Sequence, residues 1–262
     1  MANELTKLNQ LKNMLSMDST KQRFTEIMGK KAPAFISSVL QVVSNNSYLQ
    51  NADPTSVMAS AAIAATLDLS INPNLGFAAI IPFNDRQKGQ VAQIQIMVKG
   101  FKQLAMRSGQ YLALNDAIVY EGQLVKEDPF KGEYEFDYYA KKSDKVIGYM
   151  AYFKLVNGFE KYFYMTKEQV EAHGKKYSQT YKKGFGIWKD DFDAMALKTV
   201  TKLLLSKYGI LSIEMERAIT FDQSTIKGDI TNVDVNELEP EYIDNSKKSD
   251  LGEIANAEII EE

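Results

Sequence analysis

The sequence contains no cysteine, a single histidine and only four arginines among its 262 residues. Without cysteine the chain has no disulfide framework, no thiolate zinc site and no thiol nucleophile. The single histidine, His173, excludes a multi-histidine metal cluster, and any serine triad would have to be built around it. The composition therefore argues against most hydrolase and zinc chemistry.

Long apolar runs are also missing. No run approaches the roughly 18 apolar residues of a membrane span, and the start Met1–Glu4 lacks the charged and apolar regions of a signal peptide. No G-x-x-x-x-G-K-[ST] phosphate loop occurs, and no G-x-G-x-x-G motif opens a helix after a strand. We therefore expect a cytoplasmic protein without membrane contact that works without ATP.

Charge is distributed unevenly along a chain whose net charge is −3 and which is 45% apolar. Residues 229–262 carry eleven acids and two lysines, a net of −9, which leaves +6 on residues 1–228. This division indicates a body that binds a polyanion and a tail that contacts a partner or limits non-specific binding. A solvated, disordered tail without a partner is the alternative. Because 27 of the 31 cations are lysine, contacts to phosphate are favoured over reading of base edges.

Apolar residues at helical spacing predict a helical N-terminal arm over residues 1–52, and we expect this arm to serve oligomerisation. Its first helix has leucine at positions 5, 8, 11 and 15. Asp53-Pro54 then signals the start of an Ala-rich helix that reaches about Leu69. The predicted core therefore spans residues 53–228 and the acidic, disordered-like tail residues 229–262.

In the middle of the chain, apolar and polar residues alternate as they do in β-strands. Strands are expected at 77–83, 91–98, 117–125, 134–139, 146–156 and 159–164. Asn157-Gly158 predicts a hairpin turn, Thr166 and Gln169 predict a capping box, and a long helix is expected over 190–207. Runs of strands between helices, without regular strand–helix alternation, predict an α+β fold with a mostly antiparallel sheet.

A mixture of lysines and aromatic rings between Lys161 and Lys207 is typical of a groove for single-stranded nucleic acid. Lys198 and Lys202 lie four apart on the long helix, and Lys99 and Lys102 share a face of a shorter helix that ends near Arg107. The predicted DNA-binding side chains are Lys99, Lys102, Arg107, Lys198, Lys202, Lys182, Lys183, Arg86 and Lys88, and the rings expected to stack on bases are Tyr181 and Trp188. Aromatic residues of this region, Trp188 among them, also suit a core between sheet and helix.

Carboxylates offer a second interpretation. Asp190, Asp191 and Asp193 could bind a catalytic metal in a nuclease, with Glu121 as a further candidate. The same acids also suit the first turn of a helix, where they stabilise its dipole. His173 is expected at the surface rather than as a general base.

Several blocks in series resemble the RecT family of phage single-strand annealing recombinases. They cover residues 60–222 in order: Asn72-Pro73-Asn74-Leu75-Gly76-Phe77 into Ile81-Pro82-Phe83, Gln93 to Phe101, Met106 to Gln110, Val119 to Gly122, Met165 to Gln169, Met195 to Thr199 and Ile213 to Ala218. The resemblance implies a curved sheet backed by a long helix. It also implies an ATP-independent protein that anneals complementary strands and holds the nascent duplex in the groove of a ring or helical filament. The basic family positions correspond to Lys99, Arg107, Lys198 and Arg217.

The resemblance also implies partners: single-stranded and annealed duplex DNA, other copies of the chain, a 5′ to 3′ exonuclease and the host single-strand-binding protein. No cofactor is expected, with Mg²⁺ present only as a counterion of DNA, and no catalysis. A bacterial host cell and a phage or prophage origin follow from the same likeness. The composition agrees, because annealing requires base edges that are free to pair, and lysines on the backbone leave them free. The rivals are a metal-dependent nuclease and a structural scaffold protein of a virion.

Overall fold

The computed structural model describes residues 6–85, 87–178, 181, 182, 184, 187–230 and 234–242. The chain divides into two compact units: unit 1 combines Met1–Gly100 with Ile213–Ile243, and unit 2 is built on Phe101–Ser212. Helices and antiparallel strands occur in both units, so the predicted α+β class is confirmed. Among the described helices, none combines the length and the hydropathy needed to cross a membrane.

Unit 1 is mainly helical. Its helices are α1 (Lys7–Ser16), α2 (Asp18–Met28), η1 (Gly29–Lys31), α3 (Ala32–Ser44), α4 (Ser47–Gln50), α5 (Pro54–Thr66), α11 (Ile213–Phe221) and η3 (Val235–Glu237). Its strands are β1 (Ala78–Asp85), β2 (Gly89–Ile96), β8 (Thr225–Lys227) and β9 (Glu239–Glu241). Helix α6 (Val98–Arg107) crosses the boundary between the two units.

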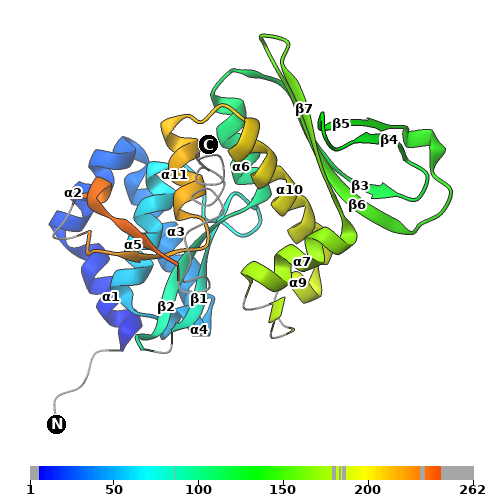
Figure 1. Ribbon diagram of the computed structural model, residues 1–262. Coiled ribbons are helices and arrows are strands. Elements are labelled where there is room, and N and C mark those ends of the chain that lie inside the picture. Colours follow the sequence, from blue (N-terminus) through cyan, green and yellow to red (C-terminus); the bar gives the residue numbers. More distant parts are fainter. Residues whose placement is uncertain are drawn as a thin grey trace, which may run out of the picture. The chain divides into compact units, whose positions relative to one another are not determined.

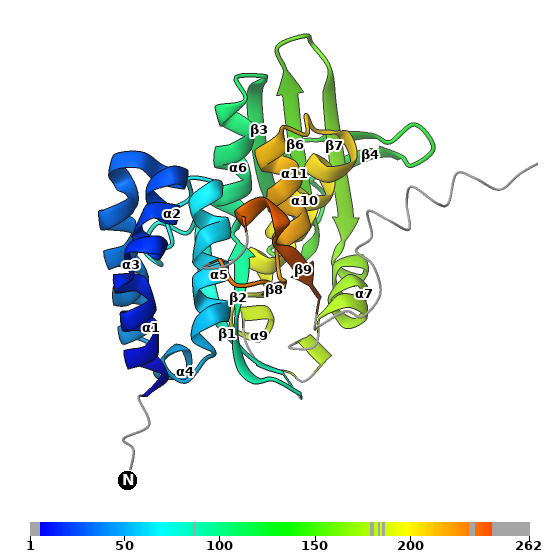
Figure 2. The ribbon, with the colours of Figure 1, turned by 90° about the vertical axis from the view of Figure 1, so that its left-hand side faces the viewer.

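Helix α5 is the centre of unit 1. It begins where Asp53 accepts a hydrogen bond from the Ser56 N–H (2.8 Å), with Pro54 in its first turn, so the predicted start is confirmed. Its many alanines let α1, α2, β2 and β8 pack closely around it. Helix α1 lies beside α5 (Figure 2), and its Leu11 and Leu15 side chains are buried. The helices of the predicted N-terminal arm are thus part of unit 1 and cover its core.

The strands of unit 1 join the two ends of the chain. Strands β1 and β2 form an antiparallel hairpin, and the Ile94 N–H donates to the Ser224 carbonyl oxygen (3.1 Å). Strand β8 pairs in turn with β9. Ile230 and Leu238 are buried, so residues 229, 230 and 234–242 of the acidic segment predicted to be a tail are part of unit 1, and the other residues of that segment lie outside the described residues.

Unit 2 is a sheet covered on one face by helices (Figure 1). Its elements are β3 (Tyr111–Tyr120), β4 (Leu124–Asp128), β5 (Glu133–Phe136), η2 (Tyr138–Ala140), β6 (Val146–Leu155), β7 (Glu160–Thr166), α7 (Lys167–Tyr177), α9 (Ile187–Asp190) and α10 (Phe192–Tyr208). The antiparallel sheet has the order β3-β6-β7. Tyr149 and Phe153 of β6 pack against Val200 and Leu204 of α10, so the long helix backs the sheet as expected.

The described strands form small antiparallel sheets, one of them the β4–β5 hairpin. One strand differs in its bounds from the sequence prediction. The strand expected over 117–125 is interrupted, because β3 ends at Tyr120 and Gly122 turns the chain with φ +92°. A Cβ atom on Gly122 would lie 2.2 Å from the Ala140 carbonyl oxygen, so only glycine fits this turn.

Candidate nucleic-acid interface

Helix α10 positions two of the predicted DNA-binding lysines. Asp191 caps its first turn by accepting a hydrogen bond from the Ala194 N–H (3.1 Å), and the helix ends at Gly209. Lys202 is partly exposed, whereas Lys198 is only 4% exposed and lies among the buried residues of the helix. The expectation that Lys198 lies with Lys202 on a face outside the buried stripe of the helix is therefore wrong, because Lys198 is among the buried residues of α10.

One lysine of each predicted pair, Lys102 and Lys202, lies near residues that join α6, β3 and α10 within unit 2. Lys102 of α6 lies 2.7 Å from Asp116 Oδ1 of β3, and Thr201 of α10 donates to Asp116 Oδ2 at 2.9 Å. Lys202 Nζ lies 5.9 Å from the centre of the Phe101 ring. We call Phe101, Lys102, Asp116, Thr201 and Lys202 the Asp116 cluster. In it, Lys102 of α6 pairs with the Asp116 carboxylate, and Lys202 of α10 lies over the ring of Phe101, the residue before Lys102.

The other cations of α6 are exposed. Lys99 lies in its first turn, and its side chain passes the turn at Gly76, where an added Cβ would lie 3.6 Å from Lys99 Cδ. Arg107 lies in the last turn of the same helix, where a positive charge stabilises the helix dipole. Both predicted positions are thus accessible to a polyanion.

Arg217 of α11 is already engaged by the chain itself. Its Nη1 donates to Asn236 Oδ1 (2.9 Å) and its Nη2 to the Val235 carbonyl oxygen (2.5 Å). Partial burial lowers the pKa of this guanidinium below its ordinary value. The C-terminal segment therefore occupies the donors of Arg217 that the sequence prediction had assigned to DNA.

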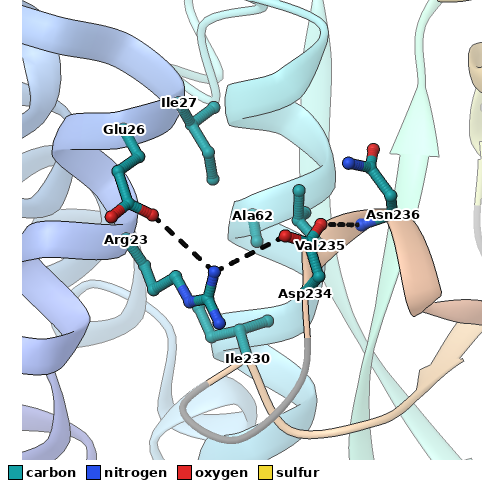
Figure 3. A pocket seen from close by; sticks show the side chains of 8 residues that line it. All are labelled: Arg23, Glu26, Ile27, Ala62, Ile230, Asp234, Val235 and Asn236. Atoms are coloured by element: carbon teal, nitrogen blue, oxygen red, sulfur yellow. Dashed lines mark hydrogen bonds and ion pairs between the residues drawn. The ribbon is translucent and has the colours of Figure 1, made fainter.

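The same C-terminal segment lines a pocket of about 200 Å³ in unit 1 (Figure 3). Arg23 Nη1 lies 3.7 Å from Glu26 Oε2 and 3.6 Å from Asp234 Oδ2. Ile27, Ala62 and Ile230 supply its apolar wall. The ion pair between Arg23 and Asp234 and the apolar contacts hold the C-terminal segment against α2 and α5. Because the Arg23 guanidinium already faces two carboxylates, the pocket is poorly suited to a polyanion.

The β1–β2 turn carries two more predicted cations. Asp85 accepts hydrogen bonds from the Lys88 N–H (2.6 Å) and the Gln87 N–H (2.7 Å), which hold its pKa below the ordinary value. Lys88 forms an ion pair with Glu241 of β9. Its ammonium group is thus partly neutralised, and Arg86 lies outside the described residues.

The rings predicted to stack on bases are part of the core of unit 2. Trp188 is only 8% exposed and belongs to the buried cluster beneath α10. Tyr181 packs edge-to-face against it, with ring centres 5.3 Å apart, and burial raises the pKa of Tyr181. Both rings are therefore already packed, which contradicts a stacking role. Lys182 is exposed beside them, and Lys183 lies outside the described residues.

Three of the four candidate metal ligands have other partners. Asp193 accepts a hydrogen bond from the Tyr149 hydroxyl (2.5 Å), Asp191 caps α10, and Glu121 accepts from the Ser143 hydroxyl (2.8 Å). Within the described ranges no three histidine, aspartate or glutamate side chains gather as a metal site. His173 of α7 lies against the Tyr177 ring at 4.7 Å. This geometry favours the capping role of the acids over a nuclease centre.

Exposed rings that the sequence did not single out occur elsewhere in unit 2. Tyr138 and Tyr139 follow β5 and are 79% and 90% exposed. The sequence prediction had included both residues in a strand. Their signal was two adjacent tyrosines followed, after Ala140, by Lys141 and Lys142.

Comparison with known proteins adds to this geometry. The sequence model of the RecT family matches residues 33–237, from α3 to η3. "Uncharacterized protein YqaK" of Bacillus subtilis (strain 168) is 48% identical over 243 residues, which cover 91% of this chain and 82% of that protein. "Protein RecT" of Escherichia coli (strain K12) is 29% identical over 211 residues, covering 76% of this chain and 75% of that protein.

Proposed function

This chain belongs to the RecT family of single-strand annealing recombination proteins, and on that premise we propose that it binds single-stranded DNA and anneals complementary strands without ATP. The observation that carries the proposal beyond the family is the Asp116 cluster, where Lys102 lies on the Asp116 carboxylate and Lys202 over the neighbouring Phe101 ring. Lysine holds phosphate as a point charge and leaves base edges free. Such contacts suit a protein that must let two strands pair.

Self-assembly follows from the same proposal. The family implies that copies of the chain associate, and a strand longer than one subunit can cover requires them to do so. We propose a ring or helical filament whose groove holds the nascent duplex. A 5′ to 3′ exonuclease and the host single-strand-binding protein are the proposed partners. The acidic residues after Tyr242, six acids against two lysines, are the segment we assign to such a partner.

The rival functions receive less support. A nuclease would need clustered ligands, and the predicted carboxylates serve as helix caps and hydrogen-bond acceptors instead. We therefore propose that the chain is not an enzyme and needs no cofactor, with Mg²⁺ acting only as a counterion of DNA. A scaffold protein would have no use for cations gathered on α6 and α10.

The first test measures the annealing of two complementary oligonucleotides by fluorescence resonance energy transfer in the absence of ATP. The second measures the affinity for one short strand at several salt concentrations. The Lys202→Ala variant should lose about 0.7 from the slope of log affinity against log salt, which is one phosphate contact on single-stranded DNA. Lys202→Arg is the matched control that keeps the charge. A parental protein that leaves the annealing rate unchanged, or that cuts the strands when Mg²⁺ is added, would contradict the proposal.

A further inference from the structure

Two adjacent tyrosines of unit 2 are held in an exposed position. Tyr138 and Tyr139 form the 3₁₀ turn η2 after β5, and their rings stand edge-to-face with centres 5.4 Å apart and planes at 87°. Most of each side chain is open to water. Rings so exposed contribute little to the core, and exposed aromatic groups commonly mark binding surfaces.

The backbone beneath these rings is tied down by hydrogen bonds. The buried Gln123 side chain accepts from the Tyr120 N–H (2.9 Å) and donates to the Tyr138 carbonyl oxygen (3.0 Å). Asp137 caps the turn by accepting from the Tyr139 N–H (2.8 Å). The Lys142 N–H donates to the Glu121 carbonyl oxygen (2.8 Å). The backbone at Gly122 lies so close to the Ala140 carbonyl oxygen that the turn after β3 is held against η2. The rings are thus preorganised, which reduces the entropy lost when a ligand stacks on them.

The charges around the rings suit a polyanion. The carboxylate of Asp137 is used by the cap, and that of Asp144 pairs with Lys141 at 2.7 Å. Lys142 and Lys145 are exposed, and neither forms an ion pair within 4 Å among the residues that the structure describes. The most exposed ring of unit 2, Phe130, is less suitable, because Asp128 caps its turn and further acids flank it in sequence.

From these observations we propose that Tyr138 and Tyr139 form a base-stacking platform for single-stranded DNA, with Lys142 and Lys145 on the neighbouring phosphates. The platform rests on the proposed function. Every base has an aromatic face, so stacking is tolerant of sequence. A base that stacks on one ring keeps its pairing edge free, and the second ring borders it at a right angle. The platform therefore supplies affinity without obstructing the complementary strand.

The experiment compares the parental chain with Tyr138→Leu, Tyr139→Leu and with Tyr138→Phe, Tyr139→Phe. The probes are a short oligothymidine and an abasic phosphodiester strand of the same length. Removal of both rings should weaken binding of oligothymidine by roughly tenfold or more, whereas the phenylalanine variant should bind as the parent does. The salt slope should stay unchanged, since stacking releases no counterions. On the abasic strand the three proteins should bind alike.

Further readouts separate the platform from the proposed function. A 2-aminopurine base in the strand should change its fluorescence on binding to the parent and lose that response with the leucine variant. A parent that binds no strand at all overturns the function itself. A parent that binds while the leucine variant matches it on both probes overturns the platform alone. Unchanged DNA affinity with smaller oligomers would assign the rings to a contact between subunits, which also overturns the platform. Equal melting temperatures establish that the exposed substitutions leave the fold intact.

Discussion

Lys102 Nζ lies 2.7 Å from Asp116 Oδ1, and both side chains are largely withdrawn from water. The second oxygen of the same carboxylate accepts from Thr201, so Asp116 joins α6, β3 and α10 within unit 2. A pair that is partly buried is screened less by salt than an exposed one. The carboxylate thus has two roles: it fixes the positions of α6 and α10 on the sheet, and it neutralises the charge of Lys102.

Asp116→Asn separates these two roles. The amide still accepts from Thr201, but it no longer neutralises Lys102, so we expect a loss of roughly 1–3 kcal/mol of stability. The released cation should add about 0.7 to the salt slope of single-strand binding. Thermal melting and short-oligonucleotide titrations measure the two effects.

A matched control is Asp68→Asn in unit 1, which removes the partner of Lys31 in an exposed ion pair of 2.8 Å. It changes the net charge equally, but exposed pairs contribute little to stability. We expect an almost unchanged melting temperature and salt slope. Equal slopes for the two variants would show that Lys102 does not reach phosphate.

The burial of Lys198 leads to a second prediction. Lys198→Ala removes a buried side chain whose methylene groups pack within unit 2, so stability should fall by about 1–3 kcal/mol. The salt slope should stay at the parental value, in contrast to that of Lys202→Ala. Lys198→Met keeps most of the volume and should recover part of the lost stability. A normal melting temperature with a slope lowered by about 0.7 would place Lys198 on the DNA after all.

Truncation tests the boundary of the acidic segment. A chain that ends after Tyr242 keeps β9, η3 and the partners of Arg217, so its melting temperature should match that of the full chain. A chain that ends after Gly228 loses the buried Ile230 and Leu238, each worth about 1.5–3 kcal/mol, and should be markedly less stable. Partner binding, measured with both chains at a temperature where they are folded, should be lost in both. A stable chain ending at Gly228 would contradict the folded boundary.

Alkaline pH should weaken unit 2 through Tyr149. Burial and the Asp193 carboxylate raise the pKa of this phenol above its ordinary value of 10.0. A folded-state pKa that is raised contributes stability that is complete below about pH 10 and is lost as the pH climbs toward the folded-state value. Tyr149→Phe lacks the hydrogen bond to Asp193 and should be less stable at pH 7 by about 1–3 kcal/mol. The difference between parent and variant should narrow above pH 10, as melting experiments on both proteins can show; a constant difference would contradict the shift.

Local signals in the sequence predicted local structure well. Asn157-Gly158 forms the β6–β7 turn, where Gly158 has φ +89° and its N–H donates to the Leu155 carbonyl oxygen. The Thr166 and Gln169 side chains form both bonds of the predicted capping box. Each of these features depends on residues within a few positions of one another, so sequence spacing alone determines them.

Contacts between residues that are far apart in the sequence could not be predicted from spacing. The sequence pattern around Trp188 and Tyr181 is compatible with both an exposed groove and a packed core. In the structure both rings pack against residues of α10 and the sheet, so they belong to the core. Arg217 donates hydrogen bonds to Val235 and Asn236, which lie 18 and 19 positions further along the chain. No local sequence rule predicts these contacts. Charge counting likewise assigned the acidic residues before Tyr242 to a tail, although Ile230 and Leu238 anchor them.

The bridge between Ile94 and Ser224 has a consequence for synthesis on the ribosome. The described part of unit 2 from residue 101 to 212 is continuous in sequence and can begin to fold once residue 212 has emerged, whereas unit 1 needs residues from before and after it. The amide groups of Ile94 and Ile96 find their acceptors on Ser224 and Asp222. The first hundred residues therefore stay incomplete during translation, and unit 1 closes only after β9, the last strand that the structure describes, has left the exit tunnel.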